Sequence, residues 1–326
     1  MIFLGIFVFC ITFFSTFFVI PLCSYIAHTF GVLDIPDGKL KKHTIAVPSF
    51  GGISIVIGVL PALILFYPFQ LSLLFWYLGV TSLLIIGFID DIVRLTAFQK
   101  FLGQIGSVFL LLYGMPQFSF GLWSGYICFF LVFFISLSII NAFNLVDVMD
   151  GLAGSLIAIS LSAYLVISYF LLQWSLMILI IALIAGIMAF LYYNISPAKI
   201  YLGDAGSLFF GGIFSSIPFL LPWPDTFSGY LSALGIVSVF LLELVWLICV
   251  RLYKRLPIYL GSPDHFSLVL QRKGWTKNQI LVYSSCIGLV SAVISLLFAF
   301  NIIGLIPMII FSIIGATLWF LVLIVL

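Results

Sequence analysis

The stretch LSLLFWYLGVTSLLIIGFIDD, residues 71–91, decides the fold class of this chain. From Leu71 to Ile89 it contains no charged side chain, and two adjacent aspartates close it. An apolar run of ~18 to 20 residues is long enough to cross the hydrocarbon core of a bilayer as a helix. Comparable runs extend from Ile2 to Ile26 and from Gly304 to Leu326. The run at 71–91 therefore predicts one of several membrane-spanning helices.

The composition agrees with this prediction. The chain has 326 residues, of which 64% are hydrophobic, 17% aromatic and 7% charged, and its mean hydropathy is +1.38. A soluble domain would carry about a quarter charged residues. We therefore predict an all-α, polytopic integral membrane protein with a single membrane-embedded domain, residues 1–326. The net charge of +2 is too small to indicate a nucleic-acid partner, and the first apolar run lacks a basic n-region and a cleavage site, so we expect it to be retained.

The apolar runs predict about eleven transmembrane helices. We place them at residues 2–27, 50–67, 71–89, 101–114, 123–142, 152–172, 175–192, 207–221, 230–250, 279–298 and 302–325. If these spans alternate, every Lys and Arg lies in loops on one side. The positive-inside rule assigns that side to the cytoplasm, with the N-terminus outside and the C-terminus cytoplasmic. The carboxylates gather on the same side, apart from Asp225 and Glu243, and this predicts an active site at that face.

Two of these loops carry acids at the end or the start of an apolar run. Asp90 and Asp91 repel each other, so a site that keeps both ionised needs a cation or a base nearby. A solvated helix end is an equal alternative for this pair. In the loop at 194–207, Asp204 directly precedes a predicted span. N-capping and metal binding are both open for this residue.

A third loop places four polar residues at intervals of three. These are Asn141, Asn144, Asp147 and Asp150. On a helix this spacing keeps the four side chains within about half of the circumference. Such a face at the mouth of an apolar bundle must be hydrated, paired or bound to a ligand. We therefore favour a binding face over a simple hydrophilic loop.

The remaining two loops are basic. The first, residues 34–52, is rich in turns and lysines and suits a phosphate group. The last, residues 251–278, contains His265 and a partly amphipathic segment that is expected to lie along the interface. A lone histidine is more often structural than catalytic, and several of the basic residues here serve topology alone.

Taken together and in this order, the five loops resemble the polyprenyl-phosphate N-acetylhexosamine-1-phosphate transferase family. The resemblance extends from Asp34 to Trp275. It implies a bacterial inner (plasma) membrane enzyme that transfers a sugar-1-phosphate from a UDP-sugar to a polyprenyl phosphate, releases UMP, and requires Mg²⁺, with Mn²⁺ as an alternative ion. The implied partners are the UDP-sugar donor, the lipid acceptor and membrane lipids, and a homodimer is left open.

The resemblance also implies a role for individual residues. The catalytic set is Asp90, Asp91, Asp147 and Asp150. The substrate-binding set is Lys39, Lys42, His43, Arg94, Asn144, Asn194, Tyr201 and His265. The Mg²⁺ ligands are Asp204 and Asn144. In this assignment the aspartate pair binds and deprotonates the lipid phosphate, and the tyrosine stacks on uracil. Direct attack by the lipid phosphate is preferred, and a two-step route through an aspartyl-phosphate stays open.

The chain departs from the family pattern at several positions. Val148 follows Asp147 where the family has glycine, and Glu243 stands where an aspartate is usual. Only His265 survives from a His-x-His-His motif, with Ser267 and Leu268 at the other two positions. There is also one extra residue in the first basic loop. The loss of the two histidines concerns the diphosphate contacts and the identity of the sugar, whereas Val148 changes the backbone freedom of its turn and Glu243 is a milder change.

Several hypotheses compete within and beyond this family. The eleven spans and the missing run of three histidines favour the branch that starts cell-envelope polysaccharides with N-acetylglucosamine-1-phosphate. The first alternative is the phospho-N-acetylmuramoyl-pentapeptide transferase branch, which has ten spans. The second is a transporter or flippase of a lipid-linked sugar, which would keep its polar groups near the bilayer midplane and show an internal repeat. A non-catalytic homologue is the third.

Overall fold

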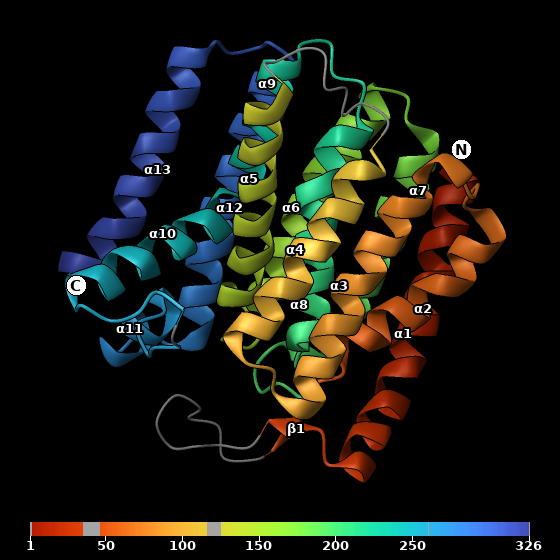
Figure 1. Ribbon diagram of the computed structural model, residues 1–326, viewed down its shortest axis with the longest axis horizontal. Helices are drawn as coiled ribbons and strands as arrows, with labels where there is room; N and C mark the ends of the chain where they lie inside the picture. Colours follow the sequence, from red (N-terminus) through yellow and green to blue (C-terminus); the bar gives the residue numbers. More distant parts are fainter. Residues whose placement is uncertain (1, 35–45, 116–124, 260, 326) are drawn as a thin grey trace.

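The computed structural model describes residues 2–34, 46–115, 125–259 and 261–325, and these are almost entirely helical (Figure 1). The α-helices are α1 (Ile2–Phe30), α2 (Gly51–Phe66), α3 (Leu74–Val93), α4 (Ala97–Tyr113), α5 (Gly125–Val146), α6 (Leu152–Phe170), α7 (Trp174–Asn194), α8 (Gly203–Ser216), α9 (Thr226–Ile236), α10 (Ser238–Tyr253), α11 (Phe266–Arg272), α12 (Lys277–Ala299) and α13 (Leu305–Val325). Two short 3₁₀ helices, η1 (Leu71–Leu73) and η2 (Ile217–Leu220), and two strands, β1 (Leu33–Asp34) and β2 (Val47–Pro48), complete the described elements. The strands pair antiparallel, with Leu33 opposite Pro48. The predicted all-α class is confirmed.

The predicted spans overlap these helices, but the count of eleven is not supported. Six helices among the described residues are long and apolar enough to cross a membrane, or seven if α9 and α10, bent by 67°, form one broken span. Other helices that coincide with predicted spans are too short to cross the bilayer. α8 has 14 residues, and at ~1.5 Å per residue it reaches only ~21 Å of a ~30 Å hydrocarbon core. The chain is therefore a multi-pass membrane protein, while the eleven spans and the sidedness of the termini stay predictions.

The short helix α8 lies in the middle of the bundle. It contacts α2, α3, α4 and α5, and nearly all of its side chains are buried. Its sequence GDAGSLFFGGIFSS is rich in glycine and serine. Small side chains let membrane helices approach closely. Such close packing holds the helices together in a membrane, where apolar side chains gain little from leaving lipid for protein. These small residues explain how four helices can surround one.

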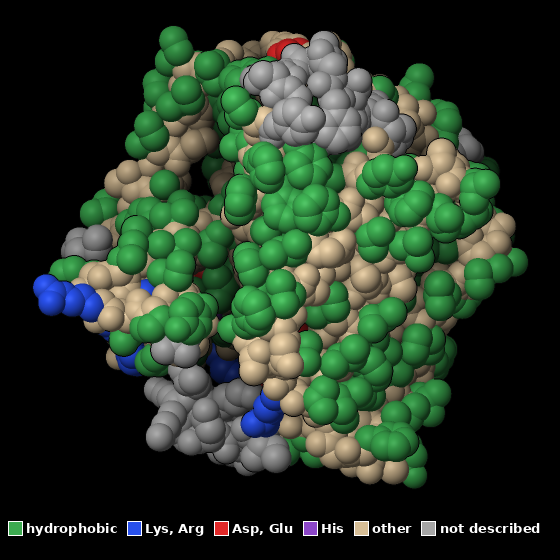
Figure 2. Space-filling model, viewed as in Figure 1, with side chains coloured by type: hydrophobic (Ala, Val, Ile, Leu, Met, Phe, Trp, Pro, Cys, Tyr) green, Lys and Arg blue, Asp and Glu red, His purple; other side chains and the backbone are tan. Residues whose placement is uncertain are grey.

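The outer surface and the helix ends differ in polarity. Apolar side chains cover much of the face in Figure 2, while Lys and Arg gather toward its lower part. Hydrogen bonds and ion pairs join the end of α3 to the starts of α4 and α8, and the end of α5 to the start of α8. The loop after α5 is joined in turn to the start of α12. The polar loops therefore meet at one end of the bundle, as the sequence predicts, whereas α9 lies toward the opposite end in Figure 1.

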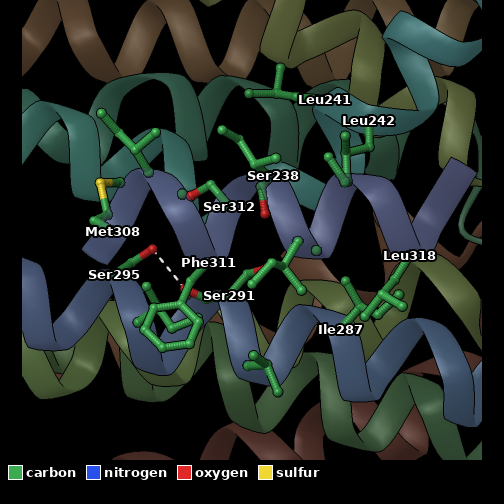
Figure 3. Close-up of a pocket in the computed structure, with 18 of the residues that line it drawn as sticks. Ser238, Leu241, Leu242, Ile287, Ser291, Ser295, Met308, Phe311, Ser312 and Leu318 are labelled. Carbon is green, nitrogen blue, oxygen red and sulfur yellow. Dashed lines mark hydrogen bonds between the residues drawn. The ribbon is translucent and has the colours of Figure 1, made fainter. Parts of the chain in front are cut away.

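A separate groove lies away from this polar end. It has a volume of about 610 Å³ and runs between α9, α10, α12 and α13 (Figure 3). Its lining is apolar apart from serines, Tyr283 and Cys286. No residue assigned to the site from the sequence lines it.

The close contact of α3 with α8 can be tested at Gly87. A Cβ atom there would collide with the backbone carbonyl of Asp204, and such overpacking costs about 1–3 kcal/mol. We expect Gly87→Ala to lower the Tm of the detergent-solubilised protein. Gly106→Ala on α4 is the matched control, because nothing lies within 4 Å of its new methyl group. An equal loss of Tm in both variants would mean that the close approach of α3 to α8 does not account for the effect of the substitution.

Candidate active site

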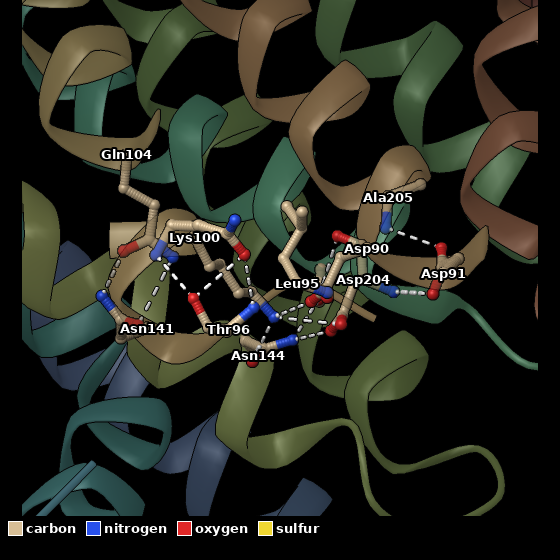
Figure 4. A network of polar contacts seen from close by, with 12 residues as sticks. Asp90, Asp91, Leu95, Thr96, Lys100, Gln104, Asn141, Asn144, Asp204 and Ala205 are labelled. Atoms are coloured by element: carbon tan, nitrogen blue, oxygen red, sulfur yellow. Dashed lines mark hydrogen bonds and ion pairs between the residues drawn. The ribbon is translucent and has the colours of Figure 1, made fainter. Parts of the chain in front are cut away.

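Four helix ends bring one ammonium and three oxygen atoms together (Figure 4). Lys100, in the first turn of α4, places its Nζ 2.9 Å from Asp90 Oδ2 and 3.0 Å from Asp204 Oδ2. The same ammonium donates to Asn144 Oδ1 at 3.3 Å. The three oxygens come from the end of α3, the start of α8 and the last turn of α5. The cluster is a small oxygen cradle with a lysine ammonium in its centre.

The turn between α3 and α4 explains why this lysine faces the aspartate. α3 ends where Arg94 adopts a left-handed conformation with φ 53°. The backbone N–H of Leu95 then donates to Asp90 Oδ1 at 2.6 Å. Thr96 starts α4 through a capping box with Gln99. Because the reversal is this tight, the first turn of α4 lies directly over the end of α3.

Asp91 does not join this cradle, although it was predicted to act beside its neighbour. Its Oδ1 accepts from the backbone N–H of Asp204 at 2.9 Å, and its Oδ2 accepts from that of Ala205 at 3.0 Å. The first N–H groups of a helix have no partner within the helix, and this carboxylate supplies one from another helix. Both of its oxygens are thus used by backbone, which favours a positioning role over contact with substrate.

Asn144 connects the cradle to the interior of α8. Its Nδ2 donates to a carboxylate oxygen of Asp204 and, at 2.9 Å, to Ser207 Oγ. One turn earlier, Asn141 exchanges hydrogen bonds with Gln104 of α4, one of them at 2.8 Å. The two amides predicted to share a helix face do so. Asn141 fixes α5 against α4 through its hydrogen bonds with Gln104.

Asp147 follows α5 and lies close to the start of α8. Burial is the main cause that raises the pKa of Asp147, to about 7, and the negative charge of Asp204 is the second. A hydrogen bond from the Gly203 backbone acts in the opposite direction and lowers this pKa. Such a carboxylate exchanges its proton near neutral pH, which is typical of functional sites. Burial also raises the pKa of the Tyr201 hydroxyl to about 12, with Asp150 and Asp147 contributing.

Asp150 and Asn194 hold loops in place. Asp150 pairs with Lys277 Nζ at 2.7 Å and accepts from the backbone N–H of Ala198 at 3.4 Å. Asn194 is only 4% exposed. It accepts from the N–H of Gly151 at 2.9 Å and donates to the carbonyl of Ile200 at 2.8 Å. These contacts favour a supporting role for both residues, whose predicted parts in catalysis and substrate binding stay untested.

A second polar pair lies where α10 faces the start of α11. His265 Nδ1 is 2.9 Å from Glu243 Oε1, and the backbone N–H of Phe266 donates to the same carboxylate at 3.3 Å. Glu243 is fully buried. The glutamate therefore orients the only histidine that survives from the expected motif. Within the described residues, no hydrogen bond or ion pair links this pair to Lys100 or its three partners.

Four predicted substrate contacts remain. Lys39, Lys42 and His43 lie outside the described residues. Arg94 is exposed, and its guanidinium forms no ion pair with any residue that the structure describes. Its predicted role in screening phosphate charge stays a prediction.

The donor set of the cradle can be compared with the needs of Mg²⁺. This ion prefers oxygen ligands and binds through one or two carboxylates, keeping several waters. Asp90, Asp204 and Asn144 offer two carboxylates and one amide oxygen, already arranged around a cation. No group of three or more His, Cys, Asp and Glu side chains suited to a metal occurs among the described residues. The set therefore fits Mg²⁺ in chemistry, with water and phosphate needed to complete its coordination.

Lys100 was missed as a site residue from the sequence, where it counted only as a topology signal. One signal could have identified it. A positive charge in the first turn of a helix is unfavourable, because the helix dipole is positive there. A lysine that occupies such a position in a nearly uncharged chain needs nearby anions.

Comparison with known proteins agrees with this geometry. Residues 73–221, which include the whole cradle, match glycosyl transferase family 4. The chain is 33% identical over 286 residues to the phospho-N-acetylmuramoyl-pentapeptide-transferase of Lactiplantibacillus plantarum, covering 79% of this chain and 85% of that protein. The chain belongs to the polyprenyl-phosphate N-acetylhexosamine-1-phosphate transferase family. A relative of the same name from Staphylococcus aureus is 32% identical over 300 residues, covering 80% and 87%.

Membership of this transferase family decides between several hypotheses. The family consists of enzymes that transfer a phosphosugar, so the transporter hypothesis loses its support. The relatives also favour the phospho-N-acetylmuramoyl-pentapeptide branch over the N-acetylglucosamine branch that the sequence patterns favour. That preference depended on a span count that the helix lengths do not support and on a few residues of one loop.

The capping role of Asp91 can be tested by comparing the stability of two Asp→Asn variants. In Asp91→Asn, an NH₂ group replaces one acceptor and faces a backbone N–H, which we expect to cost about 1–2 kcal/mol of stability. Asp225 caps α9 in the same way through the N–H groups of Phe227 and Ser228, but on the surface. Asp225→Asn should change stability by less than about 0.5 kcal/mol, because Asn caps exposed helices nearly as well. Thermal unfolding in detergent measures both, and equal shifts would contradict the buried cap.

Proposed function

We propose that this protein transfers phospho-N-acetylmuramoyl-pentapeptide from its UDP-linked donor to undecaprenyl phosphate. The reaction requires Mg²⁺ and releases UMP in cell-wall synthesis. The observation that carries the proposal is the cradle of Asp90, Asp204 and Asn144 at one end of a membrane bundle. The names of the relatives support the choice of donor and acceptor.

The proposed chemistry is a single phosphoryl transfer. An oxygen of the lipid phosphate forms a bond to the sugar-bearing phosphorus, the bond from that phosphorus to the bridging oxygen breaks, and UMP leaves with the bridging oxygen. Both reactants are anions, so the site must neutralise charge and align the groups more than supply a covalent intermediate. Mg²⁺ would supply this neutralisation on the diphosphate, with Asp204 and Asn144 to hold it.

The other residues have supporting parts in this proposal. Asp90 organises the lipid-phosphate site, and Lys100 provides a cation beside it. Asp91 fixes Asp204 through the start of α8. Asp147 lies near enough to feel the charge of Asp204 and is placed to accept a proton.

We infer that the polar end faces the cytoplasm. The UDP-linked donor is soluble, whereas the lipid acceptor is confined to the bilayer, so the two can meet only at a membrane surface. The concentration of Lys and Arg on this side supports the cytoplasmic assignment by the positive-inside rule. An external N-terminus and eleven spans belong to the same proposal.

A second donor is kept because of one observation. Ser267 and Leu268 stand where the expected motif beside His265 has two histidines, so the contacts that would select the sugar differ from the family pattern, and UDP-N-acetylglucosamine is the second candidate. Purified protein with undecaprenyl phosphate and Mg²⁺ should release UMP from UDP-N-acetylmuramoyl-pentapeptide at least about tenfold faster than from UDP-N-acetylglucosamine. The reverse preference would establish the second donor, and no UMP release from either would refute the proposed reaction.

The role of Asp204 can be tested with a matched aspartate. Asp204→Asn removes a charge from the cradle, and we expect the rate of UMP release to fall by about 10²-fold or more. Asp225→Asn should keep activity within about twofold, because Asp225 caps an exposed helix outside the cradle. A comparable loss in both variants would contradict the placement of the active site.

A further inference from the structure

We propose that Lys100 is an exchangeable counter-ion: its ammonium occupies the position between Asp90 and Asp204 that a divalent cation takes on binding, and it then moves to a substrate phosphate. This inference rests on the proposed function, because it assumes a metal-dependent reaction with phosphates. It adds an order of events to that function. The metal must bind before the site can attract its anionic substrates.

The first argument is the geometry of the ammonium. Nζ lies within 3.3 Å of an oxygen from each of three side chains, so it completes a shell that a small cation would also occupy. Among the residues described, Lys100 is the only Lys or Arg within ion-pair distance of either carboxylate. A metal that uses these oxygens therefore has to displace this ammonium or share them with it.

The second argument is access. The side chains of Asp90 and Lys100 are 10% and 16% exposed, whereas that of Asp204 is 30% exposed. An ion arriving from water therefore reaches Asp204 first. The lysine can leave, because its charge sits on a flexible four-carbon chain, while Asp90 stays held through its other oxygen by the N–H of Leu95.

The third argument is charge. With two carboxylates and one ammonium, the three side chains carry a single net negative charge, which repels phosphates. Asp91 and Asp147 lie close enough to Asp204 to interact with its charge and add further acidic groups. A bound divalent cation makes the charge of the whole site more positive by two units. In a partly buried site such a change is felt strongly, because water screens it poorly. The exchange thus lowers the repulsion of the diphosphate and the lipid phosphate and leaves the ammonium free to pair with one of them.

The first experiment uses the unaltered protein. Full-length protein in detergent is treated with an amine-acylating reagent, with and without Mn²⁺ alone, and modification of each lysine is measured by peptide mass spectrometry. We expect Mn²⁺ to raise the acylation rate of Lys100 about fivefold or more, because its ammonium leaves the carboxylates. Lys277, which pairs with Asp150 at 2.7 Å outside the cradle, is the internal control and should not change. An unchanged or slower rate at Lys100 would overturn the inference.

The second experiment measures metal affinity. Lys100→Met keeps the length of the side chain but removes the competing charge, so it should bind Mn²⁺ about tenfold more tightly than the unaltered protein. Lys277→Met is the matched control and should bind Mn²⁺ as the unaltered protein does. Adding Asp204→Asn to Lys100→Met should abolish the gain. Equal or weaker binding by Lys100→Met, or a gain that survives Asp204→Asn, would refute the exchange.

Both experiments omit the sugar donor and the lipid acceptor, so their outcome is independent of the transferase assay. A protein that shows the exchange but releases no UMP would refute the proposed reaction alone. An active transferase in which Mn²⁺ leaves Lys100 unchanged would refute the counter-ion exchange alone.

Discussion

The start of α8 is the constraint on which the polar end of this protein depends. A helix that begins where other helices surround it leaves N–H groups that need acceptors from those neighbouring elements. Asp91 of α3 accepts two of them, and Asp147 after α5 accepts that of Gly203. These acceptors come from two other helices, so the ends of α3, α5 and α8 are fixed together. Asp204, the second residue of α8, is thereby placed beside Asp90.

The same arrangement creates an electrostatic demand. Carboxylates that satisfy a buried helix start must lie close to one another, and like charges at short range in a poorly screened site are costly. Lys100 meets part of this demand by pairing with Asp90 and Asp204 at once. Burial and Asp204 still leave the pKa of Asp147 near neutrality. A site built in this way has a standing affinity for cations and, once these are bound, for phosphates.

Sequence patterns predicted the fold class and part of the site for physical reasons. Composition and apolar runs determine whether a chain enters a membrane, and the Asp and Asn motifs identified Asp90, Asn144 and Asp204. The count of eleven spans is not supported, because helices such as α8, with 14 residues, lie near the length limit, where a run alone cannot distinguish a crossing from a short buried helix. The capping role of Asp91 and the pairing of Lys100 were not predictable in this way, because their partners lie as far as 114 residues away along the chain.

The branch within the family shows how local and global signals differ. The loss of two histidines beside His265 concerns a few residues of one segment, whereas the 33% identity to the relative from Lactiplantibacillus plantarum extends over 79% of the chain. Glu243 still holds His265 and the start of α11, although glutamate replaces the expected aspartate. The longer side chain preserves the contact because a buried carboxylate must keep its hydrogen bonds to avoid a desolvation cost. Residues at the start of α11 can therefore differ from the family pattern while the hydrogen bonds that hold this helix start are retained.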